Sequence, residues 1–424
     1  MSAQDTGQPP QTEQLSGPTR KRSGTMGMGV AIAIAIVLLI VGIGAGYFIG
    51  ASTVKSSSST SKVSLTETGS SLLYPLMTSW AGNYTAASIS AAATGSGTGQ
   101  SDAELGLVNI GASDGYLKNA SVTNLVNLPV AISAQLIYYN LPGITAHLNL
   151  NGTVLAEIYN GTITTWDNPM ILAAQPSGVQ SQLSALSPNT ITPIKRSDSS
   201  GDTFLFTSMC YMSWSKWSFG YSTSALTGDS IPTGATGNSG VVAALAATKN
   251  SIGYVGISYE KSANSDGLTY AALGTTTALS ASGGVNPANY VLPSAQNISY
   301  DANLGLGHLQ FAEYGLAVSL ILGGSPAGAI NLTLGGGGTA PTSASPTPYP
   351  DANLEYTLIK LAPTGSTVTS TALAATVQFL EWAISIGNWA PGSVPSVYLD
   401  NVGFIPLTPQ VAGYDMQELA SVQP

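Results

Sequence analysis

Arg196 is the strongest single indication of chemistry in this sequence, because it stands almost alone. The chain has three arginines, and the other two, Arg20 and Arg22, lie in a basic cluster before an apolar segment. Arg196 is followed by SDSSGDTF, which combines hydroxyl side chains, a glycine and two aspartates. A guanidinium offers a planar fork of donors that matches two oxygens of a phosphate or carboxylate. We therefore expect an oxyanion site here, with Asp198 placed to orient the arginine.

Three turns share one pattern, in which small residues and a serine precede a helix-like run: TGSSLLYPL (68–76), TGSGTGQ (94–100) and SDSSGDTF (197–204). The start of a helix exposes unpaired N–H groups and a partial positive charge, and small residues let an anion approach them. Three such turns could surround one tetrahedral oxyanion. The alternative is that these residues only cap helices and form turns, as the predicted capping box of Ser101 and Glu104 does.

A nucleophile and a carboxylate lie in GASDG (111–115), which formally matches the G-x-S-x-G nucleophile elbow. Ser113 would be the nucleophile and His308 its base, but the following YLKNASVTNL lacks the strong helix that such an elbow needs. Asp114 ends a predicted strand, where its alternative role is to form a turn. With one cysteine and two histidines, the chain has no intrachain disulfide and no Cys/His zinc cluster, so we expect neither metal nor cofactor.

Composition and charge indicate an exported protein held at a membrane. Only 8% of the 424 residues are charged, and residues 28–51 are almost entirely apolar, about the length of a membrane span. We expect a cytoplasmic basic N-terminus (1–25), an uncleaved transmembrane anchor (26–51) and a Ser/Thr-rich tether (52–64), because basic residues precede the apolar segment. After the anchor, nine basic residues face nineteen acidic ones, which excludes nucleic acid as a partner.

Strand-like and helix-like runs alternate after the tether. The predicted helices cover about 72–80, 204–214 and 372–387, and the predicted strands are LVNIGAS (107–113), AQLIYYN (134–140), SIGYVGIS (251–258) and LEYTLIK (354–360). This alternation predicts α/β layers around a mainly parallel sheet, with a ligand where strand ends meet helix starts. The low-complexity stretch 334–350 predicts an exposed loop.

With these pieces in order, the chain resembles the phosphate-binding protein of ABC phosphate importers. The resemblance runs from about Leu65 to Tyr259 and returns more weakly in LEYTLIK, FLEWAISIG and the C-terminus, whereas residues 262–350 match poorly. It is carried by LTETGSSLLYPLMTSWAGNY, TGSGTGQ, VNIGASD, LAEIYNGTITTWDNP, ITPIKRSDSSGDTFLFT and SIGYVGISY. It implies an α/β, two-lobed periplasmic-binding-protein-like (Venus-flytrap) fold with a ligand cleft between the lobes. Lobe 1 would comprise 65–133 and 353–424, and lobe 2 would comprise 134–352.

The resemblance also implies which residues hold phosphate without metal: Ser71 with the Leu72 backbone, Ser96, Asp114, Arg196, Ser200, Gly201 and Asp202, with Asp198 steadying the arginine. Asp114 would accept a proton of hydrogen phosphate and reject sulfate, which has none. Two residues depart from the family pattern. Asp202 stands where the family usually has threonine, so a hydroxyl is lost and only its backbone N–H is expected to contribute. Leu72 stands where an aromatic residue is common.

By the same resemblance, the chain is expected to be the extracellular substrate-binding component of a phosphate importer, which delivers inorganic phosphate to ABC permease subunits and is not an enzyme. The alternatives are a receptor for sulfate or molybdate, and a surface-layer or adhesion protein that has the fold without the binding. The uncleaved anchor departs from the bacterial pattern and indicates an archaeal-like cell. Glycosylation is expected at some of six sequons, which begin at Asn83, Asn119, Asn151, Asn160, Asn297 and Asn331.

Overall fold

The structure is a computed structural model that describes residues 62–117, 124–226, 231, 233–274, 290–299, 349–361, 368–390 and 394–422. The predicted cytoplasmic segment, the anchor and most of the tether lie outside these residues, as do His308 and nearly all of the 334–350 loop. Among the described residues, no helix combines the length and the apolar character that a membrane span requires.

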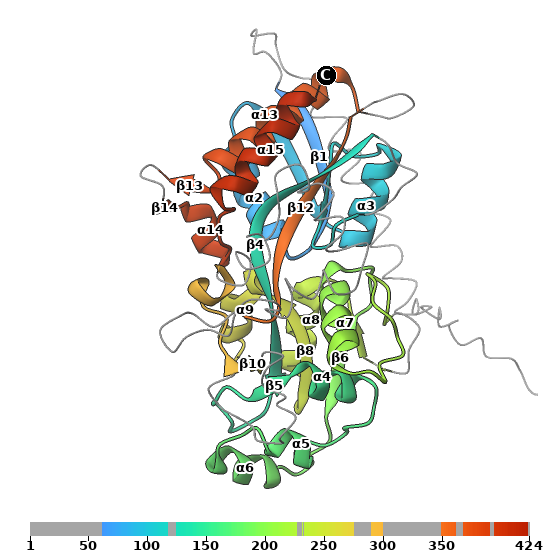
Figure 1. The fold of residues 1–424 in the computed structure, drawn as a ribbon, viewed down its shortest axis with the longest axis vertical. Coiled ribbons are helices and arrows are strands. Elements are labelled where there is room, and N and C mark those ends of the chain that lie inside the picture. The colour runs from blue at the N-terminus through green and yellow to red at the C-terminus, as the bar shows by residue number, and fades with distance from the viewer. Residues whose placement is uncertain are drawn as a thin grey trace, which may run out of the picture. The chain divides into compact units, whose positions relative to one another are not determined.

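A mixed sheet of nine strands organises the described chain (Figure 1). Its order is β2 (Ala87–Ala93), β1 (Val63–Gly69), β3 (Ile110–Ser113), β12 (Ala352–Lys360), β4 (Leu125–Asn140), β8 (Ser251–Gly256), β6 (Thr192–Arg196) and β7 (Thr233–Ala235), with β9 (Thr269–Tyr270) beside β4. The outer pairs β1–β2, β1–β3, β6–β7 and β6–β8 are parallel, but β12 and β4 are antiparallel to their neighbours. The prediction of a mainly parallel sheet is therefore wrong at its centre, because two long strands run in opposite directions there.

The two central strands connect the lobes. β4 pairs with β12 as far as Ala134, opposite Ala352, and pairs with β8 from Gln135 onward. One half of β4 thus belongs to the sheet that contains β1 and β3, and the other half belongs to the sheet that contains β6 and β8. The predicted boundaries after residues 133 and 352 fall within these two strands. Figure 1 shows β4 and β12 passing between the two groups of elements.

Lobe 1 carries the helices α2 (Tyr74–Asn83), α3 (Ser96–Leu105), α13 (Ser370–Ser385), α14 (Val397–Val402) and α15 (Pro409–Ser421), and the strand pair β13 (Trp389–Ala390) and β14 (Val394–Pro395). α13 packs on β1 and α15, while α3 packs on β1 and β3. The helices predicted around 72–80 and 372–387 are confirmed as α2 and α13. The predicted capping box is wrong, because α3 already begins at Ser96 and so places Ser101 inside the helix.

Lobe 2 carries α4 (Gly152–Tyr159), α5 (Pro169–Leu172), α6 (Ser177–Ser184), α7 (Gly201–Ser213), α8 (Gly237–Ala247), the 3₁₀ helix η1 (Ile257–Tyr259) and α9 (Glu260–Ser265). A small sheet joins β11 (Tyr290–Val291), β10 (Ala272–Gly274) and β5 (Asn149–Asn151). Phe206 stacks on Tyr254 with ring centroids 4.6 Å apart and lies 4.4 Å from the ring of Tyr159. These aromatic contacts fix α7 and α4 against β8, so the start of α7 has a rigid support.

One of the predicted glycosylation sites is inside the fold. Asn151 is buried and caps α4 through its side-chain oxygen, which accepts a hydrogen bond from the Val154 N–H. A glycan on that amide would have to break the cap and leave the core, so Asn151 is not a surface acceptor.

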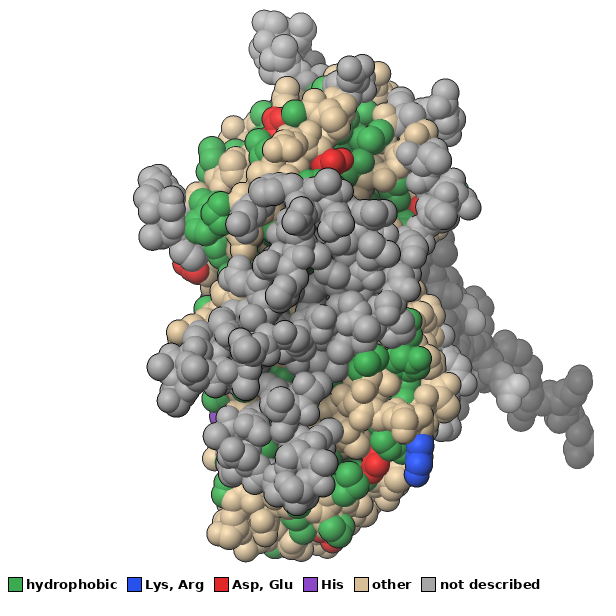
Figure 2. Space-filling view, in the orientation of Figure 1, with side chains coloured by type: hydrophobic (Ala, Val, Ile, Leu, Met, Phe, Trp, Pro, Cys, Tyr) green, Lys and Arg blue, Asp and Glu red, His purple; other side chains and the backbone are tan. Residues whose placement is uncertain are grey.

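Charge is sparse on the surface and unusually frequent inside. On the coloured part of the face in Figure 2, polar uncharged and apolar groups predominate over red and blue ones. Besides Asp114 and the arginine turn, the carboxyl groups of Glu67, Asp351, Glu355 and Asp415 are at most 1% exposed. Burial raises the pKa of Glu67 to about 8, against a smaller lowering by the Ala92 backbone, and raises the pKa values of the other three well above their ordinary range.

These buried carboxyl groups predict a protein that is more stable in mild acid than at neutral pH. The folded chain keeps protons that the unfolded chain releases, so this stability is complete below the unfolded pKa and is lost as pH rises through the folded pKa. For Glu67 this loss of stability extends from the ordinary pKa of 4.5 to the folded pKa of about 8. Thermal unfolding followed by circular dichroism should show a midpoint that falls over this range.

Glu67→Gln should flatten that dependence, because an amide has no proton to lose. Glu157→Gln, which changes a partly exposed glutamate of α4 in the same way, should not alter it. A midpoint that rises steadily between those pH values in the unmodified chain would contradict this account of the buried carboxyl groups.

Candidate oxyanion-binding site

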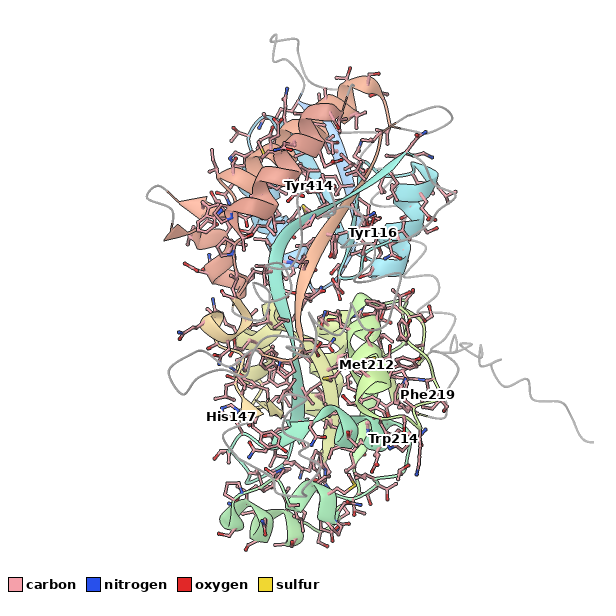
Figure 3. The ribbon with its side chains drawn as sticks, in the orientation of Figure 1. Tyr116, His147, Met212, Trp214, Phe219 and Tyr414 are labelled. Carbon is pink, nitrogen blue, oxygen red and sulfur yellow. The ribbon has the colours of Figure 1, made fainter. Side chains whose placement is uncertain are left out.

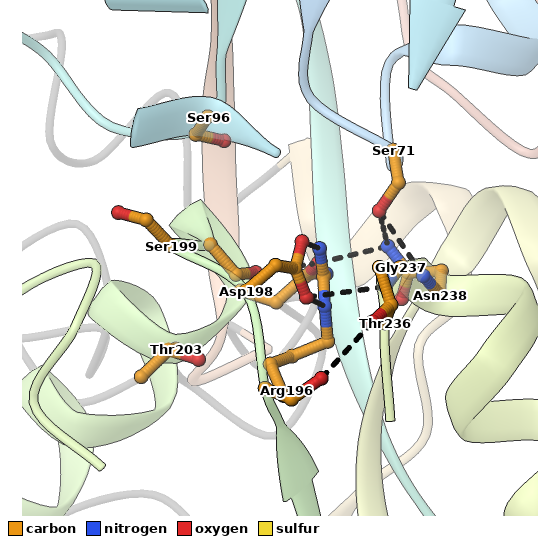
Figure 4. Close-up of polar contacts among 12 residues, drawn as sticks. Ser71, Ser96, Arg196, Asp198, Ser199, Thr203, Thr236, Gly237 and Asn238 are labelled. Carbon is orange, nitrogen blue, oxygen red and sulfur yellow. Dashed lines mark hydrogen bonds and ion pairs between the residues drawn. The ribbon is translucent and has the colours of Figure 1, made fainter. Parts of the chain in front are cut away.

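Turns from both lobes meet where several strands end and helices begin. Lobe 1 brings Ser71 from the turn after β1 and Ser96 from the start of α3, and lobe 2 brings Arg196 from the end of β6 and Asn238 from the start of α8. Figure 4 shows the two serines on one side of Arg196 and the start of α8 beside it. All three turns singled out in the sequence therefore lie at one place, and each leads into a helix.

Arg196 is the centre of this arrangement and is only 1% exposed. Its Nε donates to Asp198 Oδ1 at 2.8 Å, its Nη2 donates to Asp198 Oδ2, and its Nη1 donates to Asp202 Oδ2. Its backbone N–H donates to the Tyr254 hydroxyl at 3.0 Å. The bidentate contact with Asp198 fixes the plane of the guanidinium, as expected for a residue that orients the arginine.

Asp198 connects the arginine to α8. Its Oδ1 also accepts a hydrogen bond from the Gly237 N–H at 3.1 Å. Burial raises the pKa of Asp198, but the hydrogen bonds and the positive charge of Arg196 outweigh it, so the pKa lies below its usual value. Asp198 therefore stays ionised and holds Arg196 at neutral and mildly acidic pH.

Asp114 follows β3 and is buried beside the same turns. Ser70 donates to its Oδ1, and the Ser96 hydroxyl donates to its Oδ2 at 3.2 Å. Burial raises the pKa of Asp114, and this is only partly opposed by hydrogen bonds from Glu355, Ser70 and Ser96 and by the charge of Arg196. Asp114 therefore has a high proton affinity in a site that also contains a fixed cation.

Ser71 and Leu72 contact lobe 2. The Ser71 hydroxyl accepts hydrogen bonds from the backbone N–H and the Nδ2 of Asn238, at 3.1 and 3.0 Å. The Leu72 carbonyl accepts a hydrogen bond from the Ser258 hydroxyl at 2.8 Å. A side chain on Gly256 would come within 2.2 Å of Leu72, so the lobes approach each other closely here.

A second contact between the lobes joins the turns that contain Ser96 and Arg196. The Gly97 N–H donates to the Ser199 carbonyl at 3.0 Å, and a Cβ on Gly97 would lie 2.0 Å from the Ser199 hydroxyl. A larger residue at this position would therefore require the Ser199 side chain to move. The lobes are therefore closed on each other on both sides of Arg196.

The start of α7 lies directly against Asp114. A Cβ on Gly201 would be 2.5 Å from the Asp114 carboxylate. Next to it, the buried Asp202 side chain turns inward and its Oδ2 accepts from Arg196, from Asn238 Nδ2 at 2.8 Å and from the Ser200 hydroxyl at 3.3 Å. We expected only a backbone N–H from Asp202, whereas in the structure its side chain contacts Arg196, Asn238 and Ser200.

Four further members were missed. They are Ser70, Gln135, Asn238 and Glu355. A signal existed for three of them, since Ser70 lies in TGSSLLYPL, the first of the three turns singled out above. Asn238 lies in ATGNSG (235–240), a fourth small-residue turn before a helix, and Glu355 is a lone carboxylate in the otherwise strand-like LEYTLIK. Gln135, whose amide donates to the Asp202 carbonyl at 2.8 Å, lies in an apolar strand and gave no signal of this kind.

The hydrolase alternative finds no support in the described residues. The Ser113 hydroxyl donates to the Gly115 carbonyl at 2.7 Å and accepts from Gln100 Nε2 at 2.9 Å, so it serves the turn. His147 lies in the other lobe, where its Nδ1 is 2.7 Å from the Tyr270 carbonyl (Figure 3). His308 lies outside the described residues.

The sequence is similar to a known protein family and to several proteins named phosphate-binding protein PstS. Residues 54–303 match the family model described as a PBP superfamily domain. The phosphate-binding protein PstS of Pasteurella multocida is 33% identical over 262 residues, which cover 59% of this chain and 71% of that protein. PstS of Haemophilus influenzae is 35% identical over 47% of this chain and 59% of its own length. PstS of Xylella fastidiosa is 32% identical over 49% and 57%. The chain thus spans under two thirds of the length of these last two relatives.

Solved structures share the fold at lower sequence identity. A phosphate-binding protein from Stenotrophomonas maltophilia superposes with a TM-score of 0.56 at 18% identity, over 84% of this chain and 94% of that one. A high affinity periplasmic phosphate-binding protein bound with phosphate superposes with a TM-score of 0.55 at 20% identity, over 85% and 94%. These likenesses show the two-lobed α/β fold.

The close approach of Gly201 to Asp114 leads to a prediction. Gly201→Ala should destabilise the protein by about 1–3 kcal/mol, because the new methyl group would overlap the Asp114 carboxylate. Gly178→Ala is the matched control, since Gly178 lies near the start of α6 with nothing within 4 Å of an added Cβ. Urea unfolding of both variants measures the difference. Equal stabilities would contradict the packing described for Gly201.

Proposed function

Because the chain belongs to the PBP superfamily and, within it, to the family of the phosphate-binding proteins named PstS, we propose that it is the extracellular phosphate receptor of an ABC importer. The observation that carries this proposal is that Arg196 and Asp114 lie in one buried site between the lobes. A fixed cation attracts an oxyanion, and a carboxyl group with a raised pKa accepts a proton from it.

Phosphate would be held mainly by neutral donors around the arginine. The hydroxyls of Ser96 and Ser200, which lie against Asp114 and Asp202, and the N–H groups at the starts of α3, α7 and α8 would supply these donors. One charge-assisted hydrogen bond contributes about 1.5–3 kcal/mol, so several neutral donors must add to it for tight binding. Their local dipoles also explain how a chain with net charge −9 could bind an anion.

Asp114 would select phosphate over sulfate. Hydrogen phosphate carries a proton that the carboxylate can accept, whereas sulfate would place an unprotonated oxygen against it. A mismatch of this kind in a buried site can discriminate by about 10⁴-fold or more.

Closure of the lobes would couple binding to transport. We take 65–133 with 353–424 as lobe 1 and 134–352 as lobe 2, with the crossing strands β4 and β12 as the hinge. Phosphate that bridges the lobes would favour the closed form, in which Ser71 meets Asn238 and Gly97 meets Ser199. Permease subunits would recognise that form, and the apolar segment 26–51 would keep the receptor at the same membrane, outside the cytoplasm.

Removal of the guanidinium tests the proposal. Arg196→Ala should weaken the binding of inorganic phosphate to the full-length chain by about 10- to 150-fold, because a charge-assisted hydrogen bond is lost. Isothermal titration calorimetry measures the change. Lys216→Ala is the control, since Lys216 is exposed beyond the far end of α7. Equal phosphate affinities in Arg196→Ala and Lys216→Ala would refute the site.

Asp114→Asn should remove most of the preference for phosphate over sulfate, because an amide no longer requires a proton from the ligand. The two anions are titrated separately into the unmodified chain and the variant. Tighter binding of sulfate or molybdate than of phosphate by the unmodified chain would make it a receptor for that oxyanion. If none of the three anions binds, the adhesion alternative gains support.

A further inference from the structure

Asp202 uses donors that a bound phosphate would need. Its Oδ2 accepts from Arg196 Nη1, from Asn238 Nδ2 and from the Ser200 hydroxyl, and its side chain is fully buried. The guanidinium is thus paired with two carboxylates, Asp198 and Asp202, although it carries a single positive charge. An incoming anion meets an internal anion already bound at its site.

The charges around Asp202 make a dianion unfavourable. Asp198 stays ionised and neutralises Arg196, so an ionised Asp202 and an ionised Asp114 would leave the site net negative before any ligand enters. Hydrogen phosphate with two further negative charges would then face two buried carboxylates without matching cations. Buried charges without partners are strongly unfavourable, so protons must enter with the ligand.

Other groups around Asp202 do not change this balance. The titratable or charged groups that face it are Arg196 at the end of β6, Asp198 in the next turn, Asp114 after β3, Asp351 before β12, Tyr254 on β8 and Tyr259 in η1. Glu355 on β12 faces Asp114. Burial raises the pKa of Tyr254 and Tyr259 further above their ordinary value, so both stay neutral near pH 7, and burial also raises the pKa of Asp351, which favours its neutral form. Arg196 is the one cation among these residues.

We propose that Asp202 is a second specificity-determining carboxylate, which makes the site take phosphate in its dihydrogen form and couples binding to the uptake of a proton. This inference rests on the proposed function. Whether the proton sits on Asp202 or on the phosphate oxygen that faces it, the number of protons bound is the same. Asp114 requires one proton on the bound phosphate, and Asp202 requires a second one.

The electrostatics of Asp202 agree with such a role near neutral pH. Burial and the negative charge of Asp114 raise its pKa to about 7, although Arg196, Asn238 and Gln135 oppose the rise. At about pH 8 the ionised form would then exceed the protonated form about tenfold, and the apparent affinity falls by the same factor if only the protonated form binds. At about pH 5 Asp202 is protonated, so its ionisation no longer lowers the apparent affinity for phosphate.

Calorimetric titration of the full-length chain with inorganic phosphate tests this inference. At about pH 8, measurements in two buffers with different ionisation enthalpies give the number of protons taken up per phosphate. We expect about one more proton for the unmodified chain than for Asp202→Asn.

The pH dependence of the affinity is a second readout. Between about pH 5 and 8 the unmodified chain should lose about tenfold more affinity for phosphate than Asp202→Asn does. Asp266→Asn, which changes an exposed aspartate beyond α9, should behave like the unmodified chain.

The outcomes separate the inference from the proposed function. If the unmodified chain binds phosphate without taking up a proton at about pH 8, the inference is overturned and the proposed function stands; this readout needs no variant. Phosphate binding with the same pH dependence in the unmodified chain and in Asp202→Asn overturns it as well. If Asp202→Asn does not fold, Asp202→Thr provides the same comparison. Failure of the unmodified chain to bind phosphate at any pH overturns the proposed function and, with it, this inference.

Discussion

The burial of one guanidinium among carboxylates from separate parts of the chain is the constraint on which the site depends. Arg196 lies at the end of β6 with almost no exposure, and Asp198 holds it through two hydrogen bonds. A buried cation requires partners, and these partners in turn fix the turn before α7 and the start of α8. The ion pair of Arg196 and Asp198 also positions the remaining donors, because Ser200, Gly201 and Asn238 lie on the segments that this ion pair fixes.

The same constraint links the site to the contact between the lobes. Asn238 donates both to Asp202 in lobe 2 and to Ser71 in lobe 1, so it connects the buried charges to the closing surface. On the other side, Gly97 and Ser199 meet through a backbone hydrogen bond, and a Cβ on Gly97 would overlap the Ser199 side chain. A change in charge at Asp202 or Arg196 therefore acts on groups that also hold the lobes together. Binding and closure are then two aspects of one network.

Much of this could be predicted from local sequence, because the site is built from turns whose residue types reveal their position. The lone arginine, the small-residue turns and Asp114 at a strand end identified the segments that meet. The individual contacts depend on tertiary packing. Whether Ser70 or Ser71 reaches Asp114 depends on how the turn leaves β1, and the inward direction of Asp202 depends on Arg196 and Asn238. The mixed sheet was missed because the local pattern of β4 and β12 does not show which strands they pair with.

The most direct measurement of the central claim is a crystal structure of the protein grown with phosphate. The account predicts one phosphate between the lobes, with oxygens within hydrogen-bonding distance of both the Arg196 guanidinium and the Asp114 carboxyl group. It also predicts that the Arg196 contact with Asp198 is retained. Phosphate bound elsewhere, or a phosphate between the lobes that touches neither Arg196 nor Asp114, would contradict it.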